Sequence, residues 1–312
     1  MPTLLDYRRR IRSVKSTQQI TRAMKFVAAA KLRRAQEGVF AARPYAREIL
    51  RVMRSAAARI ESPQHALLER RDEKSVLTVV LTGDRSLAGA FNTNVIRRAL
   101  QFLREQQSKQ LQLIAVGKKG RDTLKKRGYD LAAEWVGVSS NVEFSSAKEI
   151  AAKIAELYAE RKVDAVYVVY NEFKNVLVQK LQVQKLLPID PGILAETGAE
   201  SELSKGHEAD AAKLPHQLSP SGKEFLVDYI YEQPIEEIFN GLVPRYLEAE
   251  VYRVLLESAA AEHAARMTAM DSATRNAADL IERLTLDMNK IRQAGITKEL
   301  IEIVSGAASA MG

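Results

Sequence analysis

In the last quarter of the chain, apolar residues recur at alternating steps of three and four residues. Pro244 is the last proline, and between it and residue 311 only Gly295 and Gly306 interrupt a run of helix-forming residues. An unbroken helix over residues 234–310 is roughly 110 Å long. The apolar row consists of Met267, Met270, Thr274, Ala277, Ile281, Leu284, Met288 and Ile291. A row this narrow is typical of a helix wound around a partner helix rather than laid on a sheet.

Residues 3–60 show the same rhythm and are predicted to be helical, with Pro44 marking a kink or a break. The row comprises Ile11, Val14, Gln18, Thr21, Lys25, Ala28, Leu32, Ala35 and Val39. Its small members let two helix backbones approach closely, while the polar Gln18 and Lys25 fix the register at some cost in stability. We therefore predict that the two ends of the chain pair as an antiparallel coiled coil. The alternative is an amphipathic helix that packs on its own globular domain.

Between the two ends, the pattern changes to apolar runs that alternate with amphipathic segments. Ser75–Leu81 is a continuous β-branched run, as expected of a strand buried on both faces. The other predicted strands are Leu111–Val116, Ala133–Val138, Val163–Tyr170, one or two within Phe173–Leu187, and Glu224–Tyr231. The predicted helices are Val95–Glu105, Lys118–Arg127 (a short basic helix or turn) and Ser146–Arg161. This order predicts a mainly parallel sheet with helices on its faces.

The predicted fold class is therefore α/β: a long antiparallel coiled coil of the N- and C-terminal helices plus a central Rossmann-like α/β domain. The predicted segments are an N-terminal coiled-coil helix at 1–60, the central domain at 74–233 and a C-terminal coiled-coil helix at 234–312. Pro234 and Pro244 flank the entry into the last of these. Residues 190–220 contain Gly, Pro, Ser and acidic residues with little apolar periodicity, which predicts an exposed, mobile acidic loop.

Composition excludes several classes of protein. Among the 312 residues, 46% are hydrophobic and 28% charged, which is typical of an ordinary soluble protein. No apolar run reaches the roughly 18 residues that span a bilayer, and the first residues lack the features of a secretory signal. With no cysteine there is no disulfide, thiolate nucleophile or cysteine-ligated metal. The four histidines lie in unrelated contexts, so we expect no metal site.

The positive charge is concentrated at the N-terminus. The chain has a net charge of +8, whereas residues 1–60 alone hold fifteen Lys and Arg against Asp6, Glu37 and Glu48, a net +12. A basic helix of this kind suggests an anionic partner, such as nucleic acid, a lipid surface or acidic protein loops. A solvated face without a partner explains the charge equally well.

The loop Thr82–Asn94, TGDRSLAGAFNTN, is the main candidate for chemistry, because a strand–loop–helix junction can present N–H groups to phosphate. It matches neither GxxxxGK[ST] nor GxGxxG. Asp84 and Asn92 could serve as an acid and its partner, yet both are good capping residues. No grouping of Ser, His and Asp has a distinguishing signature. We therefore expect no catalytic residue and no cofactor.

Two long motifs at opposite ends of the chain resemble those of the gamma subunits of F-type ATP synthases. The first is IRSVKSTQQITRAMKFVAAAKLRRAQ, at residues 11–36. The second, at residues 266–309, ends in ITKELIEIVSGAAS, and TGDRSLAGAFNTN is similar to the strand–loop element of the same family. Ser86, Ala88 and Ala90 depart slightly from the family's commoner small residues, which affects loop packing more than function.

The resemblance implies a central-stalk rotor subunit that couples proton flow through the membrane c-ring to ATP synthesis or hydrolysis. In this family the paired helices turn inside a ring of three alpha and three beta subunits, and the α/β domain joins the epsilon subunit and the c-ring. Catalysis occurs on beta, so the resemblance implies no catalytic site, cofactor or nucleic-acid partner here. It also implies a peripheral location on the cytoplasmic face of the bacterial plasma membrane.

Carried over by motif, the coupling contacts to the beta subunits are six residues of the two terminal helices: Met24, Arg266, Arg292, Gln293, Thr297 and Glu299. Arg292 and Gln293 offer donors for carboxylates on a beta-subunit loop. Without the resemblance, each of the six is an ordinary solvated helix residue. A basic coiled-coil protein that binds nucleic acid or acts as a scaffold is the alternative function. A phosphate-handling enzyme built on the central domain is a third possibility.

Overall fold

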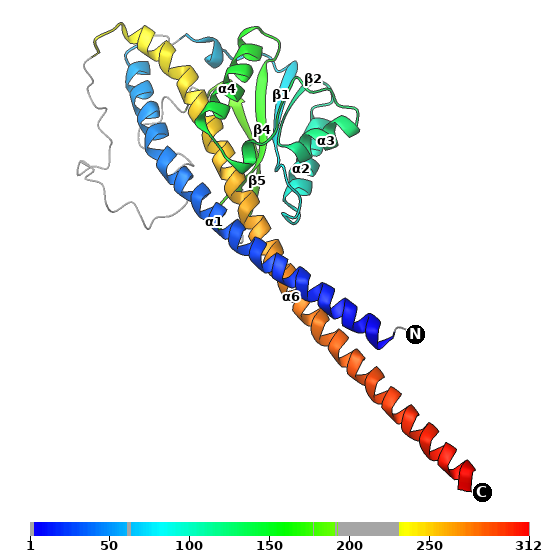
Figure 1. Ribbon diagram of the computed structural model, residues 1–312. Coiled ribbons are helices and arrows are strands. Elements are labelled where there is room, and N and C mark those ends of the chain that lie inside the picture. The colour runs from blue at the N-terminus through cyan, green and yellow to red at the C-terminus, as the bar shows by residue number, and fades with distance from the viewer. Residues whose placement is uncertain (1–2, 61–63, 177, 191, 193–230, 312) are drawn as a thin grey trace. The chain divides into compact units, whose positions relative to one another are not determined.

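The protein is described by a computed structural model in which two long helices and a five-stranded sheet are the main elements (Figure 1). The structure describes residues 3–60, 64–176, 178–190, 192 and 231–311. Two compact units are present: residues 1–30 with 266–312, and residues 31–265. We call the first the paired-helix unit and the second the α/β unit. Helices α1 (Leu4–Ala57) and α6 (Ile235–Met311) each contribute to both units.

Both long helices contain a proline in their interior. Helix α1 runs unbroken through Pro44, so the predicted break does not occur. Helix α6 starts directly after Pro234 and continues through Pro244, which therefore lies inside the helix and not at its entry. A proline inside a helix costs about 3 kcal/mol because it removes a backbone hydrogen bond. Packing of the buried residues that follow each proline, such as Met53 and Leu247, offsets this cost.

The sheet has the order β3-β2-β1-β4-β5. Its strands are β1 (Ser75–Leu81), β2 (Gln110–Val116), β3 (Ala133–Trp135), β4 (Ala165–Phe173) and β5 (Gln179–Leu187). The first four pair in parallel, whereas β5 is antiparallel to β4. The chain moves outward from β1 to β3 and then returns to the other side of β1. The prediction of a mainly parallel sheet is confirmed.

Several element boundaries differ from those expected. The connecting helices are α2 (Phe91–Glu105), α3 (Lys118–Lys126) and α4 (Phe144–Ala159), and two short 3-10 helices cover Ala66–Leu68 and Val138–Ser140. Helix α2 begins inside the predicted loop, and the predicted strand at 133–138 ends at Trp135. Residues 173–187 contain the end of β4 and one further strand. Of the strand predicted at 224–231, residues 224–230 lie outside the described residues, as does nearly all of the acidic segment 190–220.

Alternating strand residues build a separate core on each face of the sheet. Val80, Ala115 and Val169 belong to a cluster with residues of α2 and α3. Their neighbours on the opposite face belong to a larger cluster with α4 and with the segments of α1 and α6 in the α/β unit. Figure 1 shows α2 and α3 on one side of the sheet and α4 on the other. Both faces are covered, as the continuous apolar strands require.

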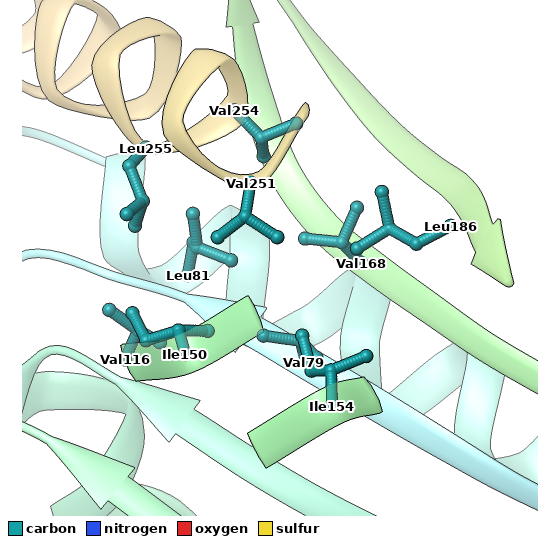
Figure 2. Close-up of a pocket in the computed structure, with 10 residues that line it drawn as sticks. All are labelled: Val79, Leu81, Val116, Ile150, Ile154, Val168, Leu186, Val251, Val254 and Leu255. Carbon is teal, nitrogen blue, oxygen red and sulfur yellow. The ribbon is translucent and has the colours of Figure 1, made fainter. Parts of the chain in front are cut away.

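A small cavity lies within the larger cluster. Figure 2 shows its lining, which includes Val251 and Leu255 of α6, Ile150 of α4 and Val79 of β1. All ten lining residues are aliphatic, and the volume is about 10 Å³. A space of this size barely accommodates one water molecule, and an apolar lining gives that water no partner. The cavity is a packing gap and not a ligand site.

One charged cluster is buried between α6 and the sheet. The Arg253 guanidinium donates to Glu250 Oε2 at 2.8 Å, to Glu257 Oε1 at 2.9 Å and to Gln184 Oε1 at 3.0 Å. The side chains of Arg253, Glu250 and Glu257 are only 14%, 8% and 12% exposed. Burial raises the pKa of Glu257, although Arg253 opposes that effect. Glu257 Oε2 has no hydrogen-bond partner among the described residues, so this carboxylate depends on Arg253.

Replacement of Arg253 by methionine is expected to lower the free energy of unfolding of the α/β unit by about 3–5 kcal/mol, because two buried carboxylates lose their ion-pair partner. The measurement is urea unfolding followed by fluorescence of Trp135, the one tryptophan of the chain. Lys174→Met is the control, since this lysine pairs with Glu172 while 37% exposed, and we expect it to cost less than about 1 kcal/mol. Equal losses in the two variants would contradict the assignment.

Candidate functional site

The carboxyl edge of the sheet, where ligands bind in many α/β proteins, is closed by short backbone contacts. Thr82, directly after β1, accepts a hydrogen bond from the Gly120 N–H at 2.8 Å and donates to the Val116 carbonyl at 3.2 Å, both through Oγ1. Gly117 has φ +98°, and a Cβ there would lie 2.0 Å from the Thr82 carbonyl oxygen. The connection between β2 and α3 therefore packs directly against the end of β1, and position 117 requires glycine.

Asp84 occupies the position where a phosphate would meet the start of α3. Its carboxylate accepts hydrogen bonds from the Lys118 N–H at 2.9 Å, the Gly137 N–H at 3.0 Å and Ser139 Oγ at 2.9 Å. A helix N-terminus with exposed N–H groups is the usual anion site, and here the chain's own carboxylate fills it. Asn92 Oδ1 accepts the Gly83 N–H at 2.8 Å. Both residues thus hold the loop Thr82–Asn94 together.

The crevice between the ends of β1 and β4 is filled by helix α6. This is the point where the strand order reverses, and ligands of open α/β sheets usually bind there. A Cβ on Gly83 would lie 2.6–2.8 Å from the carboxylate atoms of Glu262 on α6. Beside this contact, Ala88 and Phe91 form a buried cluster with Ala261. Among the described residues, no group of three or more His, Asp or Glu side chains is suited to a metal ion.

In the paired-helix unit, polar contacts join the two helices. The hydroxyls of Thr21 and Thr274 lie 2.8 Å apart, and Lys25 Nζ lies 2.5 Å from Asp271 Oδ1. From the first contact to the second, the position on α1 moves forward by four residues, while the position on α6 moves back by three. The two helices therefore run antiparallel. All predicted row positions between residues 11 and 28 and between 267 and 291 are buried or half-buried. The predicted pairing of the chain ends is confirmed.

The same register leaves the end of α6 without a partner helix. Leu4, the first residue of α1, lies seventeen residues before Thr21. In the antiparallel pair it therefore lies opposite Ile291, which is seventeen residues after Thr274 on α6. Figure 1 shows α6 extending past the N-terminal end of α1. We call residues 292–311 the bare end of α6. Five large apolar side chains on it are 50–67% exposed: Ile296, Leu300, Ile301, Ile303 and Val304. Apolar exposure on this scale indicates a surface that a partner covers.

The structure separates the six residues predicted to make coupling contacts into two groups. Arg292, Gln293, Thr297 and Glu299 are all exposed on the bare end, where Thr297 Oγ1 donates to the Gln293 carbonyl at 3.0 Å. Met24 and Arg266 are half-buried on the paired section. Arg266 and Arg292 are separated by about 40 Å along α6. The six residues therefore do not form one pocket. They are distributed along the length of the paired helices and the bare end.

Sequence reasoning missed Asp271, the partner of Lys25. Hydrogen bonds from Lys25 and Arg275 lower the pKa of the Asp271 carboxyl. Asp271 directly follows Met270, which belongs to the apolar row of the C-terminal helix. A charged residue next to this row is the feature of the sequence that could have identified it. The lysine belongs to the apolar row of α1 and the aspartate lies beside the row of α6. That the two form an ion pair can be predicted only when the register between the helices is known.

Reversal of one charge of this pair is expected to loosen the paired helices locally. Asp271→Lys places a third cation beside Lys25 and Arg275, so hydrogen exchange of the backbone amides of residues 11–28 should accelerate by up to about fivefold. The double variant Lys25→Asp with Asp271→Lys should restore most of the protection. Mass spectrometry of exchanged peptides provides the measurement. A double variant that exchanges as fast as the single one would show that the contact does not stabilise the pair.

Within the part of the chain that the structure describes, we find no helical segment with the length and hydrophobicity of a transmembrane span.

Comparisons with known proteins agree with this geometry. The family described as ATP synthase matches residues 3–310. The ATP synthase gamma chain of Solibacter usitatus is 49% identical over 314 residues, covering 99% of this chain and 100% of the relative. That of Pelotomaculum thermopropionicum is 48% identical over 309 residues, covering 99% of each.

Solved structures of ATP synthases are also similar. One chain of the Tetrahymena thermophila mitochondrial ATP synthase central stalk/c-ring is 27% identical, with a TM-score of 0.56 over 81% of this chain and 99% of that chain. A chain of the Euglena gracilis mitochondrial ATP synthase is 22% identical and shares the fold, with a TM-score of 0.61 over 99% of this chain and 94% of that one. The match of the family over nearly the whole length, and relatives of almost half identical sequence, show that this chain belongs to the ATP synthase gamma chain family.

Proposed function

We propose that this chain is the central-stalk rotor subunit of an F-type ATP synthase. Rotation of its paired helices couples proton flow through the membrane c-ring to ATP synthesis or hydrolysis on the beta subunits. The observation that carries the proposal is the bare end of α6, a single helix with large apolar residues that are 50–67% exposed. A helix of this kind needs an enclosing apolar partner in solution, and a ring of three alpha and three beta subunits provides one.

The asymmetry of the paired-helix unit explains how rotation changes catalytic sites. A rotor can shift the affinities of three identical sites only if it contacts each site differently. The bare end of α6 is a single helix, whereas the section of α6 that precedes it is paired with α1. Charge is also uneven, because residues 1–30 hold seven Lys and Arg against Asp6, a net +6, whereas residues 266–312 hold six basic and six acidic residues, a net charge of zero. Each orientation of such a rod presents different groups to the surrounding subunits.

Catalysis occurs on the beta subunits, and we propose no catalytic residue for this chain. The carboxyl edge of the sheet supports this, since Asp84 fills the anion position and Glu262 fills the crevice beside β1. The sheet then serves as a scaffold that joins the epsilon subunit and the c-ring. We further propose that the chain lies peripherally on the cytoplasmic face of the bacterial plasma membrane, as part of the complex. The comparisons lend no support to the nucleic-acid-binding alternative.

The six coupling contacts remain part of this proposal. On the bare end, Arg292 and Gln293 present exposed donors to carboxylates of a beta-subunit loop. Met24 lies beside Lys25, whose ammonium group is already paired with Asp271. The basic outer face of α1 supplies long-range attraction to acidic loops, which orients the rod without specifying single partners.

Reconstitution provides the direct test of the proposed function. Purified alpha and beta subunits are mixed with this chain, and the ATPase activity of the complex is measured against ATP concentration. We expect a stable complex with three copies each of alpha and beta per chain and cooperative ATP hydrolysis. The control is the same chain truncated after Ile291, which lacks the bare end and should assemble less stably. Failure of the full chain to assemble, or non-cooperative kinetics identical to alpha and beta alone, would contradict the proposal.

Met24→Lys is expected to weaken coupling. A new ammonium group beside the paired helices attracts acidic loops more strongly in some orientations than in others, so rotation becomes uneven. In membrane vesicles that contain the whole complex, the number of protons pumped per ATP hydrolysed should fall severalfold, while Met24→Leu should retain the parent value. Identical yields in the lysine variant and the parent would count against the assignment of Met24.

A further inference from the structure

The proposed function requires the sheet and helix α6 to turn together, because α6 is one continuous helix that contributes to both units. Toward the sheet, α6 presents an apolar stripe. Figure 2 shows Val251, Val254 and Leu255 of this stripe among aliphatic residues of β1, β4 and β5. Apolar attraction has no preferred direction. It holds α6 against the sheet and specifies the rotation of the helix about its own axis only through the fit of side-chain shapes.

A second stripe of α6 carries charge. Glu250, Arg253 and Glu257 follow one another at steps of three and four residues, so they lie on one side of the helix. Glu250 and Arg253 directly precede Val251 and Val254, which offsets the charged stripe from the apolar stripe by about 100° around the helix axis. The charged stripe therefore lies beside the apolar contact, where Arg253 reaches β5.

Gln184 of β5 joins the charged stripe to the sheet. Its Oε1 accepts hydrogen bonds from Arg253 Nη2 at 3.0 Å and from the Tyr170 hydroxyl at 3.1 Å. Its Nε2 donates to Glu250 Oε2 at 3.4 Å. Tyr170, on β4, is only 3% exposed, so the amide of Gln184 is held by a buried residue of the sheet while it binds two residues of α6.

A contact at this place opposes rotation of α6 about its axis. Side-chain tips lie about 5–6 Å from the axis of a helix, so a rotation of about 20° moves them by about 2 Å. A displacement of that size breaks the 3.0 Å hydrogen bond between Arg253 and Gln184, because a hydrogen bond requires a short distance and a defined angle. Aliphatic side chains that move by the same distance exchange one apolar neighbour for another and stay buried.

Stability alone does not explain three charged side chains at this position. The side chains of Glu250, Arg253 and Glu257 are 8–14% exposed, and the cost of removing such groups from water commonly cancels their mutual attraction. Apolar residues of similar volume often give a buried contact of equal or greater stability. They provide no fixed geometry, whereas the planar guanidinium group donates in defined directions.

We propose that Gln184 and the charged stripe lock the rotational setting of α6 on the sheet, so that α6 and the sheet turn without slack between them. Gln184 is then a positioning residue for coupling, which acts through Arg253 and Glu250. This inference rests on the proposed function, which supplies the torque. It adds a residue of the sheet to the six coupling contacts on the terminal helices.

The isolated chain tests the lock directly, because the absence of cysteine allows two spin labels at chosen positions. Gln101→Cys on α2 and Arg245→Cys on α6 are both exposed positions of the α/β unit, and pulsed electron paramagnetic resonance measures the distance between their labels. Gln184→Leu should widen the distribution of this distance by about 2 Å or more, because the label turns with α6. The matched control is Gln182→Leu. Gln182 donates to Glu172 of β4 at 3.0 Å, a bond within the sheet, so the control should keep the parent distribution.

A triple variant separates the rotational setting from stability. Glu250→Leu, Arg253→Met and Glu257→Leu together remove all three charges, and this variant should recover most of the stability to urea that Arg253→Met alone loses. Its distance distribution should nevertheless be as wide as that of Gln184→Leu. A triple variant as unstable as Arg253→Met, or one that keeps the narrow parent distribution, overturns the proposal.

The consequence for coupling is measured in the complex assembled with alpha and beta subunits. The beta subunits are fixed to a surface, a non-hydrolysable ATP analogue stops rotation, and a bead attached at position 101 reports the angular fluctuations of the sheet. With Gln184→Leu the angular spread should exceed that of Gln182→Leu by about 10–20°, the rotation that the lost hydrogen bonds release. The steady ATPase activity of the two complexes should be the same.

The outcomes distinguish this inference from the proposed function. Equal distance distributions in Gln184→Leu and Gln182→Leu contradict the lock, and equal angular spreads in the complex contradict its role in coupling. Both results leave the proposed function standing. A parent chain that forms no complex contradicts the proposed function and, with it, the role in coupling, while the distances in the isolated chain still decide whether Gln184 locks α6.

Discussion

The register between α1 and α6 is the constraint on which the function of this protein depends. Two side-chain contacts, Thr21 with Thr274 and Lys25 with Asp271, mark it in the paired-helix unit. Because α1 begins at Leu4, this register leaves α6 without a partner beyond Ile291. Helix α6, with its exposed apolar residues, therefore continues as a single helix beyond the point where α1 begins. Under the proposed function, a symmetric rod could not distinguish three identical surroundings, and the unequal length of the two helices is one source of the asymmetry that coupling needs.

Helix α6 has a second role within the α/β unit. The sheet has a strand order that in other proteins creates a ligand crevice. Here a Cβ on Gly83 would clash with the Glu262 carboxylate, and Ala261 packs against the loop after β1. Asp84 satisfies the N–H groups to which an anion would bind. The sheet is thus built as a rigid base for α6, and the buried Arg253 cluster ties the same helix to β5.

Much of the fold follows from local patterns. Steps of three and four residues located both helical rows, and the β-branched run at Ser75–Leu81 located the central strand, because periodicity reports which faces are buried. The boundaries were less well predicted. Pro44 was expected to kink or break α1, yet the helix continues without a break from Leu4 to Ala57. Phe91 starts α2 inside a segment whose Gly and Asn residues suggested a loop.

The sequence by itself determined that the two chain ends form long helices with narrow apolar rows, that the middle is a mainly parallel α/β sheet, and which family motifs the chain carries. The tertiary structure alone decided that Lys25 meets Asp271, that the register ends at Ile291, and that Glu262 lies against Gly83. The physical reason is that periodicity is a property of neighbouring residues. Contacts between residues 253 positions apart, such as Thr21 and Thr274, depend on how whole elements pack.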